Sequence, residues 1–419
     1  MNTPKNLSPG VVVGVTLDTK GEETEWLCEQ LRGCGLSPIV VDCGVLGGAA
    51  MHAQITADVI AESGGVALDE LRQRADRAQA IPVMMRGLEV QLGELHRAGR
   101  VQGYIGIGGG TNAALASAAF RVLPFGIPKL LVSTNASGDT RELVGIKDVV
   151  LMHSVVDILG LGSYLKALLS RAARVMAALV VDAAERRIVR SQRCAALTAF
   201  GSTTPAANHA YGLLKRAQLD VLTFHARGIG GLAAEAFIED GVVDVFLDLT
   251  TTEIADEIVG GVRSAGPSRM DAAANMGIPQ VVLPGAIDMV NFGARATIPT
   301  RFEGRKFLEH TPFSTLMRTT AIENESIAKF MAAKLRKARG PVAVILPLGG
   351  HSAYDAPGKP FYDPASDAAF RDTLKAELAG TVTVFEIDRH INHPMCAELA
   401  VRTLIDLLEQ GNAPHGKEI

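Results

Sequence analysis

The chain has 419 residues, of which 47% are hydrophobic and 21% charged, and its net charge is −4. This length is typical of two or three domains, and the hydrophobic content is sufficient for sizeable cores. The slightly acidic balance, with only 5% aromatic residues, excludes the basic surface expected of a nucleic-acid-binding protein.

The five cysteines include no Cys-x-x-Cys pair, and any disulfide scheme leaves one of them unpaired, so we expect free thiols in a reducing compartment. The polar segment Met1–Gly10 has no secretory core, and the longest apolar stretch, Arg174–Val181, is too short to span a bilayer. The sequence therefore predicts a cytoplasmic protein without a membrane or nucleic-acid partner.

In the first half of the chain, β-branched runs alternate with helical segments, the pattern of a parallel α/β sheet. The predicted strands are Val11–Val15, Pro38–Val41, Gly103–Ile107, Lys129–Ser133 and Val149–His153. The predicted helices are Glu22–Arg32, Leu68–Gln79, Val83–Ala98, Thr111–Val122 and Ser163–Ala178. The alanine-rich segment Ser163–Arg187 predicts a long helix that leads to a domain boundary near Val181–Arg190.

The second half repeats this alternation. Its predicted strands are Ala195–Phe200, Val221–Phe224, Val243–Asp248, Gln280–Leu283, Val342–Leu346 and Val382–Ile387. Its predicted helices are Pro205–Gln218, Ala233–Glu239, Ser268–Met276, Glu323–Ala338, Ala365–Leu378 and Met395–Gln410. We therefore expect an α/β protein with two Rossmann-like, doubly wound domains (1–183 and 184–419) and mainly parallel sheets, whose ligands bind at the carboxyl ends of the strands.

A glycine-rich turn, Gly106–Gly110, joins a predicted strand to the helix that starts near Thr111, and a second polar turn, Thr134–Asp139, follows the next strand. Their backbone N–H groups and the helix dipole are suited to bind an anion, most simply a nucleotide phosphate. Alternatively, the glycines only permit close packing, since no Gly-x-Gly-x-x-Gly or P-loop pattern stands in its usual place. The residues expected around the anion are Gly108, Gly109, Gly110, Thr111, Asn112, Ser133, Thr134, Ser137 and Gly138.

The first strand is followed by Asp18, Thr19 and Lys20. Lys20 could reach a phosphate, and Asp18 could bind a ribose hydroxyl or a metal-bound water. In the alternative interpretation, Asp18 or Thr19 only caps the next helix.

Three consecutive strand ends in the second half carry hydroxyl, glycine and basic residues, which predicts a second pocket for a carboxylate or phosphate. The residues assigned to this pocket are Thr203, Thr204, His225, Arg227, Gly228, Thr251, Asn291 and Arg318. Arg318 could neutralise an acidic substrate or simply bridge carboxylates of the protein.

Histidines gather in two late loops. His351, His390 and His393, with Asp355 or Asp388, could act as acid and base, ligate a divalent metal, or cap helices. The spacing is not that of the His-Glu-x-x-His helix, so the identity of any metal stays open. The catalytic candidates are His351, Asp355, His390 and His393.

Several segments, taken together, resemble the ATP-binding family named after the tomato protein that confers resistance to tobamoviruses, long catalogued in bacteria as uncharacterised. The matching segments are Leu123–Lys129, Ser133–Gly138, Ser154–Ile158, Phe200–Pro205, Asp248–Glu253, Ala286–Gly293, Leu316–Thr320 and Asp355–Lys359. The resemblance covers nearly the whole chain. It implies two Rossmann-like domains, ATP or another nucleotide in the first, and self-association into a homodimer or higher oligomer. It also implies a TIM-barrel partner, because plant members carry such a barrel at their C-terminus.

The family's phosphate loop reads roughly Gly-Gly-Ser-Gly-Gly-Thr, whereas two of its glycines are Thr111 and Asn112 in this chain. Side chains at these positions would narrow the approach to the backbone. Family members also tend to have an aliphatic residue at the position of His351 and Asp at that of His393. Two added imidazoles suggest chemistry particular to this branch.

The leading hypothesis is a cytoplasmic enzyme with a nucleotide in the first domain, which Mg²⁺ could accompany. A small acidic or phosphorylated metabolite would bind at the cleft between the domains, where His351 or His393 would move protons. One alternative is a non-catalytic, nucleotide-dependent protein that regulates a TIM-barrel partner. Another is a metal-dependent lyase or hydrolase that needs no nucleotide.

Overall fold

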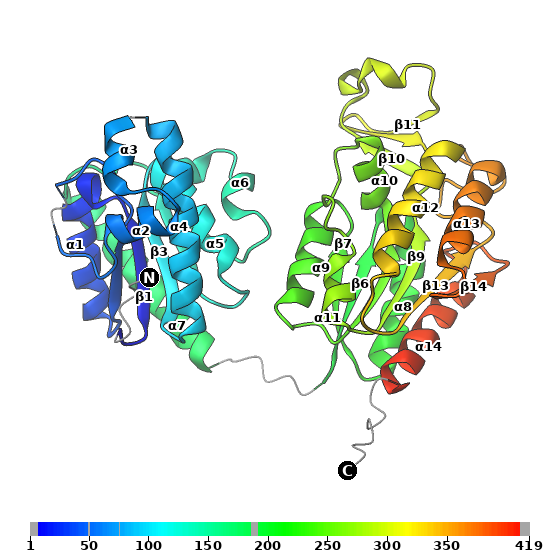
Figure 1. Cartoon of the computed structure of the whole chain (residues 1–419), viewed down its shortest axis with the longest axis horizontal. Helices are drawn as coiled ribbons and strands as arrows, with labels where there is room; N and C mark the ends of the chain where they lie inside the picture. Colours follow the sequence, from blue (N-terminus) through cyan, green and yellow to red (C-terminus); the bar gives the residue numbers. More distant parts are fainter. Residues whose placement is uncertain (1–6, 49–50, 75, 186–191, 411–419) are drawn as a thin grey trace, which may run out of the picture. The chain divides into compact units, whose positions relative to one another are not determined.

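The computed structural model describes residues 7–48, 51–74, 76–185 and 192–410. The chain divides into two compact units, Met1–Val189 and Arg190–Ile419 (Figure 1). Each unit contains a parallel sheet covered by helices on both faces, which confirms the predicted α/β class with two Rossmann-like, doubly wound domains. The predicted division after residue 183 falls inside α7 (Ser163–Glu185). Residues 186–190, at the predicted end of this helix and boundary, lie outside the described residues.

The first unit has a five-stranded parallel sheet in the order β2-β1-β3-β4-β5. Its strands are β1 (Gly10–Val15), β2 (Pro38–Asp42), β3 (Val101–Gly108), β4 (Lys129–Ser133) and β5 (Val150–His153). Its helices are α1 (Leu17–Gly33), α2 (Ala57–Ser63), α3 (Leu68–Arg74), α4 (Arg77–Arg97), α5 (Gly110–Val122), α6 (Arg141–Val144) and α7. The strand order reverses between β1 and β3, so α1 and α5, the helices that follow these two strands, cover opposite faces of the sheet.

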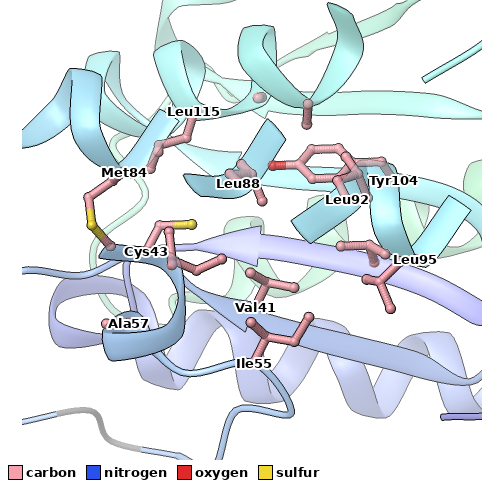
Figure 2. Packing of buried hydrophobic residues seen from close by; sticks show 14 of the residues in the cluster. Val41, Cys43, Ile55, Ala57, Met84, Leu88, Leu92, Leu95, Tyr104 and Leu115 are labelled. Atoms are coloured by element: carbon pink, nitrogen blue, oxygen red, sulfur yellow. The ribbon is translucent and has the colours of Figure 1, made fainter. Parts of the chain in front are cut away.

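The sheet of the first unit is apolar because both of its faces are covered. Side chains alternate along β1: Val12 packs in the core under α2 to α5, whereas Val11 and Val13 pack in the core under α1 and α7. Figure 2 shows the first of these cores, in which side chains of α4 and α5 lie over those of β2 and β3. The labelled residues from these elements are Met84, Leu88, Leu92, Leu95, Leu115, Val41 and Tyr104.

The second unit has a six-stranded parallel sheet in the order β14-β13-β9-β8-β6-β7. Its strands are β6 (Cys194–Ala199), β7 (Asp220–His225), β8 (Val245–Thr250), β9 (Gln280–Gly285), β13 (Val342–Pro347) and β14 (Thr383–Ile387). Helices α8 (Thr204–Arg216) and α14 (Pro394–Gln410) cover one face. The other face carries α9 (Ile229–Glu239), α10 (Thr252–Val259), α11 (Asp271–Met276), α12 (Ala321–Leu335) and α13 (Pro364–Leu378). Here the strand order reverses between β6 and β8.

A small antiparallel sheet, β10-β12-β11, is the main feature that the sequence pattern did not predict. Its strands are β10 (Met289–Phe292), β11 (Phe307–Thr311) and β12 (Ser314–Arg318). They contain only four or five residues each, too few for their alternation to be distinguished from a polar loop. The short helices α2, α6 and α10 were also not predicted. In the described part of the chain, no helix combines the length and apolar character that crossing a membrane requires.

Candidate functional site

The loops after β1 and β3 meet where the strand order of the first unit reverses, and Asn112 of α5 joins them. Its Oδ1 accepts a hydrogen bond from the Thr16 N–H at 3.0 Å, and its Nδ2 donates to the Thr16 hydroxyl at 3.1 Å. Asn112 is only 3% exposed. These hydrogen bonds hold the Asn112 side chain at the end of β1. It therefore does not narrow the access of a ligand to the glycines that precede it.

The three glycines of this loop differ in what they require. Gly108 has a φ of +141°, and an added Cβ would lie 2.5 Å from the Asn112 amide nitrogen, so both backbone and packing demand glycine there. At Gly109 and Gly110 the nearest atoms to an added Cβ are the Thr134 hydroxyl at 3.8 Å and the Asn135 amide nitrogen at 3.7 Å. Neither has a left-handed φ. Neither backbone conformation nor packing requires glycine at these two positions. Its effect there is to leave the backbone at the start of α5 accessible.

The turn after β4 forms the short 3-10 helix η1 (Thr134–Ser137). Buried Ser133 accepts a hydrogen bond from the Asn135 N–H at 3.1 Å, and the exposed Ser137 hydroxyl donates to the Thr134 carbonyl at 3.3 Å. Gly138 is exposed and follows directly. The structure thus brings Thr134 close to Gly109, and it adds Asn135, which the sequence analysis did not select.

Asp18, Thr19 and Lys20 lie in the first turn of α1, which a kink at Lys20 (φ −130°, ψ 26°) separates from the rest of the helix. The Lys20 ammonium donates to the Ile158 carbonyl at 2.5 Å, so this cation is already bonded within the protein. Asp18 Oδ2 accepts from the Leu46 N–H at 2.8 Å, and the Thr19 hydroxyl lies 2.7 Å from that of Thr16. The N-cap position belongs to Thr16, whose side chain makes no cap hydrogen bond, so neither Asp18 nor Thr19 caps the helix as expected.

A cavity of about 310 Å³ lies beside this loop, between the ends of β1 and β2 and helices α3, α4 and α5. Thr16, Asp18, Thr19, Arg72, Asp76 and Thr111 are its polar lining residues. Its apolar lining is Cys43, Val45, Leu46, Leu71, Ala80, Ile81, Met84 and Leu115. Figure 2 shows Cys43, Met84 and Leu115 gathered at one end of the core. The sequence could not reveal this cavity, because its lining comes from segments far apart in the chain.

The second unit has a pocket of about 370 Å³ at the carboxyl ends of β6 and β7, lined by Phe200, Gly201, Ser202, His225, Arg227, Arg263, His310, Thr311, Ser314, Leu316 and Tyr354. The described lining contains two arginines and two histidines but no carboxylate side chain. The guanidinium of Arg263 lies 5.5 Å from the centre of the Phe200 ring and donates to Asn291 Oδ1 at 3.0 Å and to the Ser314 hydroxyl at 3.2 Å.

Positive charge is concentrated in this second-unit pocket. Burial, and then the neighbouring Arg227, lower the pKa of Arg263. Burial also lowers the pKa of His225, which the same two arginines lower further against its bond to the Ala199 carbonyl. Both shifts mean that burial, and then the neighbouring cations, disfavour the charged forms of these groups, which a bound anion would stabilise.

Ser202 is a buried polar residue of this pocket, 4% exposed, with a hydroxyl group that is unpaired among the described residues. The adjacent hydroxyls are occupied: Thr203 pairs with Thr250 at 2.7 Å, and Thr204 donates to the Phe200 carbonyl at 3.1 Å. These threonines hold the loop in place, while Ser202 is one of the residues that line the pocket.

Other residues assigned to the second pocket are engaged elsewhere. The N–H groups of Gly228 and Gly231 donate to the buried Glu253 carboxylate at 2.6 and 3.0 Å. Thr251 donates to the Leu283 carbonyl at 3.3 Å. Three residues of this pocket were not predicted from the sequence: Arg263, His310 and Tyr354. His310 Nδ1 and the Tyr354 hydroxyl lie 3.1 Å apart.

Arg318 is buried, 4% exposed, and each of its nitrogens donates within the protein. Nε bonds to the Phe361 carbonyl at 2.7 Å, Nη1 to the Thr319 hydroxyl at 2.8 Å, and Nη2 to Asp367 at 2.5 Å. Two roles were considered for Arg318: neutralising an acidic substrate and bridging carboxylates of the protein. Its hydrogen bonds match the second role, because every one of them goes to a group of the protein.

The three candidate histidines occupy different environments. His390 accepts the Asn392 N–H at Nδ1 (3.1 Å), and its Nε2 lies 2.9 Å from the Ser352 carbonyl, so both nitrogens are occupied in a neutral ring. The exposed His393 accepts the Met395 N–H at 3.3 Å, at the start of α14. His351, in contrast, is buried beside Asp355.

Two family models match the chain. Residues 9–185 match the N-terminal domain, and residues 192–408 the C-terminal domain, of "Uncharacterised protein family (UPF0261)". The chain is 41% identical over 401 residues to a UPF0261 protein of Clostridium tetani, covering 96% of this chain and 99% of that protein. A UPF0261 protein of Rhizobium meliloti is 38% identical over 94% of this chain and 98% of its own length.

The ToMV resistance protein Tm-1(GCR237) of Solanum lycopersicum is 41% identical over 337 residues, which cover 79% of this chain but only 45% of the tomato protein. Among solved structures, UDP-N-acetylglucosamine 2-epimerase from Rickettsia bellii has 13% identity and a TM-score of 0.22 over 65% of this chain and 78% of that chain, too low a likeness for any inference. The matches to both domain models and to full-length relatives agree. The chain belongs to the UPF0261 family.

Proposed function

We propose that this chain is a nucleotide-binding protein whose first unit holds the phosphates at the start of α5. The supporting observation is that Gly109 and Gly110 are glycine where neither backbone nor packing requires it. They lie at the reversal of strand order between β1 and β3, where doubly wound sheets bind ligands. The first N–H groups of a helix lack intrahelical partners, and its dipole favours negative charge there.

The neighbouring cavity supplies a place for the rest of the nucleotide. Its volume of about 310 Å³ is within the range of small-molecule sites, about 300–1,000 Å³. Thr111 belongs both to the first turn of α5 and to the lining of the cavity, so phosphates at α5 would direct a base toward apolar Leu71, Ile81 and Met84. ATP is the first candidate, and Mg²⁺ would accompany its phosphates near the oxygens of Thr111 and Asp18.

The test is calorimetric titration of the whole chain with ATP, ADP and other nucleotides, with and without Mg²⁺. Gly109→Val should abolish the heat of binding, because its side chain would cover the N–H groups at the start of α5. Gly162→Val is the matched control, since Gly162 also directly precedes a helix, α7, and also faces open space. Absence of binding by the wild-type chain at millimolar nucleotide, or equal loss in both variants, would contradict the proposal.

A second function, binding of a small acidic or phosphorylated metabolite, is favoured by the second-unit pocket. Arg227 and Arg263 supply positive charge, and Ser202 supplies a buried hydroxyl without a partner. Burial in an apolar environment strengthens such charge-assisted bonds. The Tyr354 hydroxyl and His310 form a pair that could transfer a proton to or from the bound molecule, which makes enzymatic turnover the natural extension.

Thermal-shift screening against keto acids, dicarboxylates and sugar phosphates tests this second function. A ligand that binds only the folded state raises the melting temperature, and the rise grows with the logarithm of its concentration relative to Kd. We expect a shift with at least one such acid, and its loss in Ser202→Val. A response to nucleotides alone would leave the second pocket without this role.

Turnover and partner affinity distinguish an enzyme from a regulator. An enzyme consumes the acid or the nucleotide when both are present. A nucleotide-dependent regulator binds a TIM-barrel protein with an affinity that changes with nucleotide, and Tyr354→Phe leaves that affinity unaltered. Self-association, which the family resemblance implies, is measured by sedimentation of the full chain.

A further inference from the structure

A cluster of buried polar groups lies beyond β13, separate from the pocket described for the second unit. The loop after β13 carries His351 and Asp355, and the first turn of α13 carries Asp367. One potential ligand atom from each of these three residues lies within 4.8 Å of the other two. His351 is 3% exposed, Asp355 is fully buried, and the Asp367 side chain is 16% exposed.

Two of these side chains present buried atoms without a partner. Asp355 Oδ2 accepts the His351 N–H at 2.8 Å, but no N–H or O–H donor of the described residues reaches Asp355 Oδ1 or His351 Nδ1. The Asp355 carboxyl group also faces that of Asp367, with which it shares a hydrogen bond only when one of the two is protonated. Buried polar atoms are almost always paired, because leaving them unpaired costs free energy. A cation between the two side chains would satisfy both atoms at once.

The charged groups around the cluster also favour binding of a cation. Asp288 is fully buried beside it, where its Oδ2 accepts from the Ser352 hydroxyl at 2.7 Å and its Oδ1 has no partner in the described structure. Arg318 pairs with Asp367, but its other donors serve Thr319 and backbone carbonyls. Burial favours the neutral forms of these three carboxyl groups, and a divalent cation would displace their protons and balance the negative charge that then exceeds the one guanidinium.

We propose that His351, Asp355 and Asp367 bind a divalent transition-metal ion. An imidazole with two carboxylates suits Zn²⁺ or Mn²⁺ better than Mg²⁺, which prefers oxygen ligands only. The three ligand atoms lie within 4.8 Å of one another, so bonds of about 2 Å to Zn²⁺ need at most small movements of the side chains.

Three protein ligands leave a coordination position vacant, as in catalytic rather than structural zinc sites. A cavity of about 130 Å³ adjoins the cluster, and His351, Asp367 and Arg371 are among its lining residues. A water molecule or a small oxyanion in this cavity would reach the ion, with Arg371 as the counter-charge. The proposed metal site is therefore accessible to a ligand although two of its three residues are buried.

The experiment strips the whole chain with a chelator and titrates it with Zn²⁺ or Co²⁺. We expect about one ion per chain by calorimetry and a visible Co²⁺ absorption band. His351→Gln and Asp367→Asn should each weaken binding about tenfold or more, since even residues that only support ligands commonly have effects of this size. His393→Ala is the matched control, because this exposed histidine comes from the neighbouring strand end and lies outside the cluster.

A measurement on the wild-type chain keeps the proposal testable if a variant fails to fold. Cu²⁺ bound at the proposed site should show hyperfine coupling to the nitrogen of one imidazole. Binding of no ion at micromolar affinity, coupling to no nitrogen, or unchanged affinity in a folded His351→Gln protein would each overturn the proposal. A melting temperature that rises with Zn²⁺ in the wild type but not in Asp367→Asn would support it.

Discussion

Asn112 and Thr16 form two reciprocal hydrogen bonds across the point where the strand order of the first unit reverses. The amide oxygen accepts from the Thr16 N–H at 3.0 Å, and the amide nitrogen donates to the Thr16 hydroxyl at 3.1 Å. Both residues are buried. The pair fixes the start of α5 relative to the end of β1, so the open glycines between β3 and α5 rest on a rigid support.

Asn112→Ala should destabilise the chain by about 1–3 kcal/mol, because it leaves the buried Thr16 N–H without its acceptor. Urea unfolding followed by circular dichroism measures this loss. Asn135→Ala is the control, since that exposed amide lies near the same loop, and exposed substitutions usually change stability by less than about 0.5 kcal/mol. Equal effects of the two variants would show that the buried pair does not stabilise the loop.

Gly108→Ala and Gly110→Ala should separate glycines that serve the fold from glycines that face a ligand. The first places a Cβ at a φ of +141° and 2.5 Å from the Asn112 amide, which should cost about 1–3 kcal/mol. The second meets no atom closer than 3.7 Å and has no left-handed φ, so unfolding should change little. A large loss of stability in Gly110→Ala would return this glycine to a purely structural role.

Arg318→Met should lower stability, whereas Arg227→Ala should weaken ligand binding. The first removes a buried cation from Asp367 and several carbonyls, which should cost about 3–5 kcal/mol of stability. Arg227 is exposed at the second-unit pocket, so its loss should leave unfolding unchanged and weaken binding of an acidic ligand. Unfolding curves and ligand titration measured on both proteins test this contrast. A folded Arg318→Met chain with weakened ligand binding alone would contradict it.

Secondary-structure elements that are determined by local sequence patterns were predicted correctly. Strand β4 and the start of α7 were predicted at their observed residues, because a short apolar run bounded by polar residues and an alanine-rich segment specify them. The sequence did not predict where polar side chains point. Lys20 turns to Ile158 because α1 departs from helical geometry at this residue, with φ −130° and ψ 26°. Arg263 and Asp367 were overlooked because only tertiary packing brings them to the pocket and to His351.

Asp256 predicts an unusual dependence of stability on pH. Its carboxylate accepts hydrogen bonds from the Arg263 N–H at 3.1 Å and the Asn291 amide at 2.7 Å, yet burial raises its pKa from the ordinary 3.8 to about 7. The raised pKa means that the folded chain binds a proton which the unfolded chain releases near pH 4. Stability should therefore fall as pH rises from about 4 to about 7, and level off above that.

The difference between 3.8 and about 7 corresponds to about 4 kcal/mol for Asp256 alone, as an upper bound. Burial also raises the pKa of Asp288, Asp355, Asp367, Glu235 and Glu253, which adds to the fall in the same direction. Asp256→Asn cannot ionise, so urea unfolding at several pH values should give a shallower decline for this variant than for the wild type. Asp372→Asn, at an exposed carboxylate, is the control. An equal pH dependence of stability in the wild type and in Asp256→Asn would show that Asp256 is ionised in the folded chain, held so by its three N–H donors.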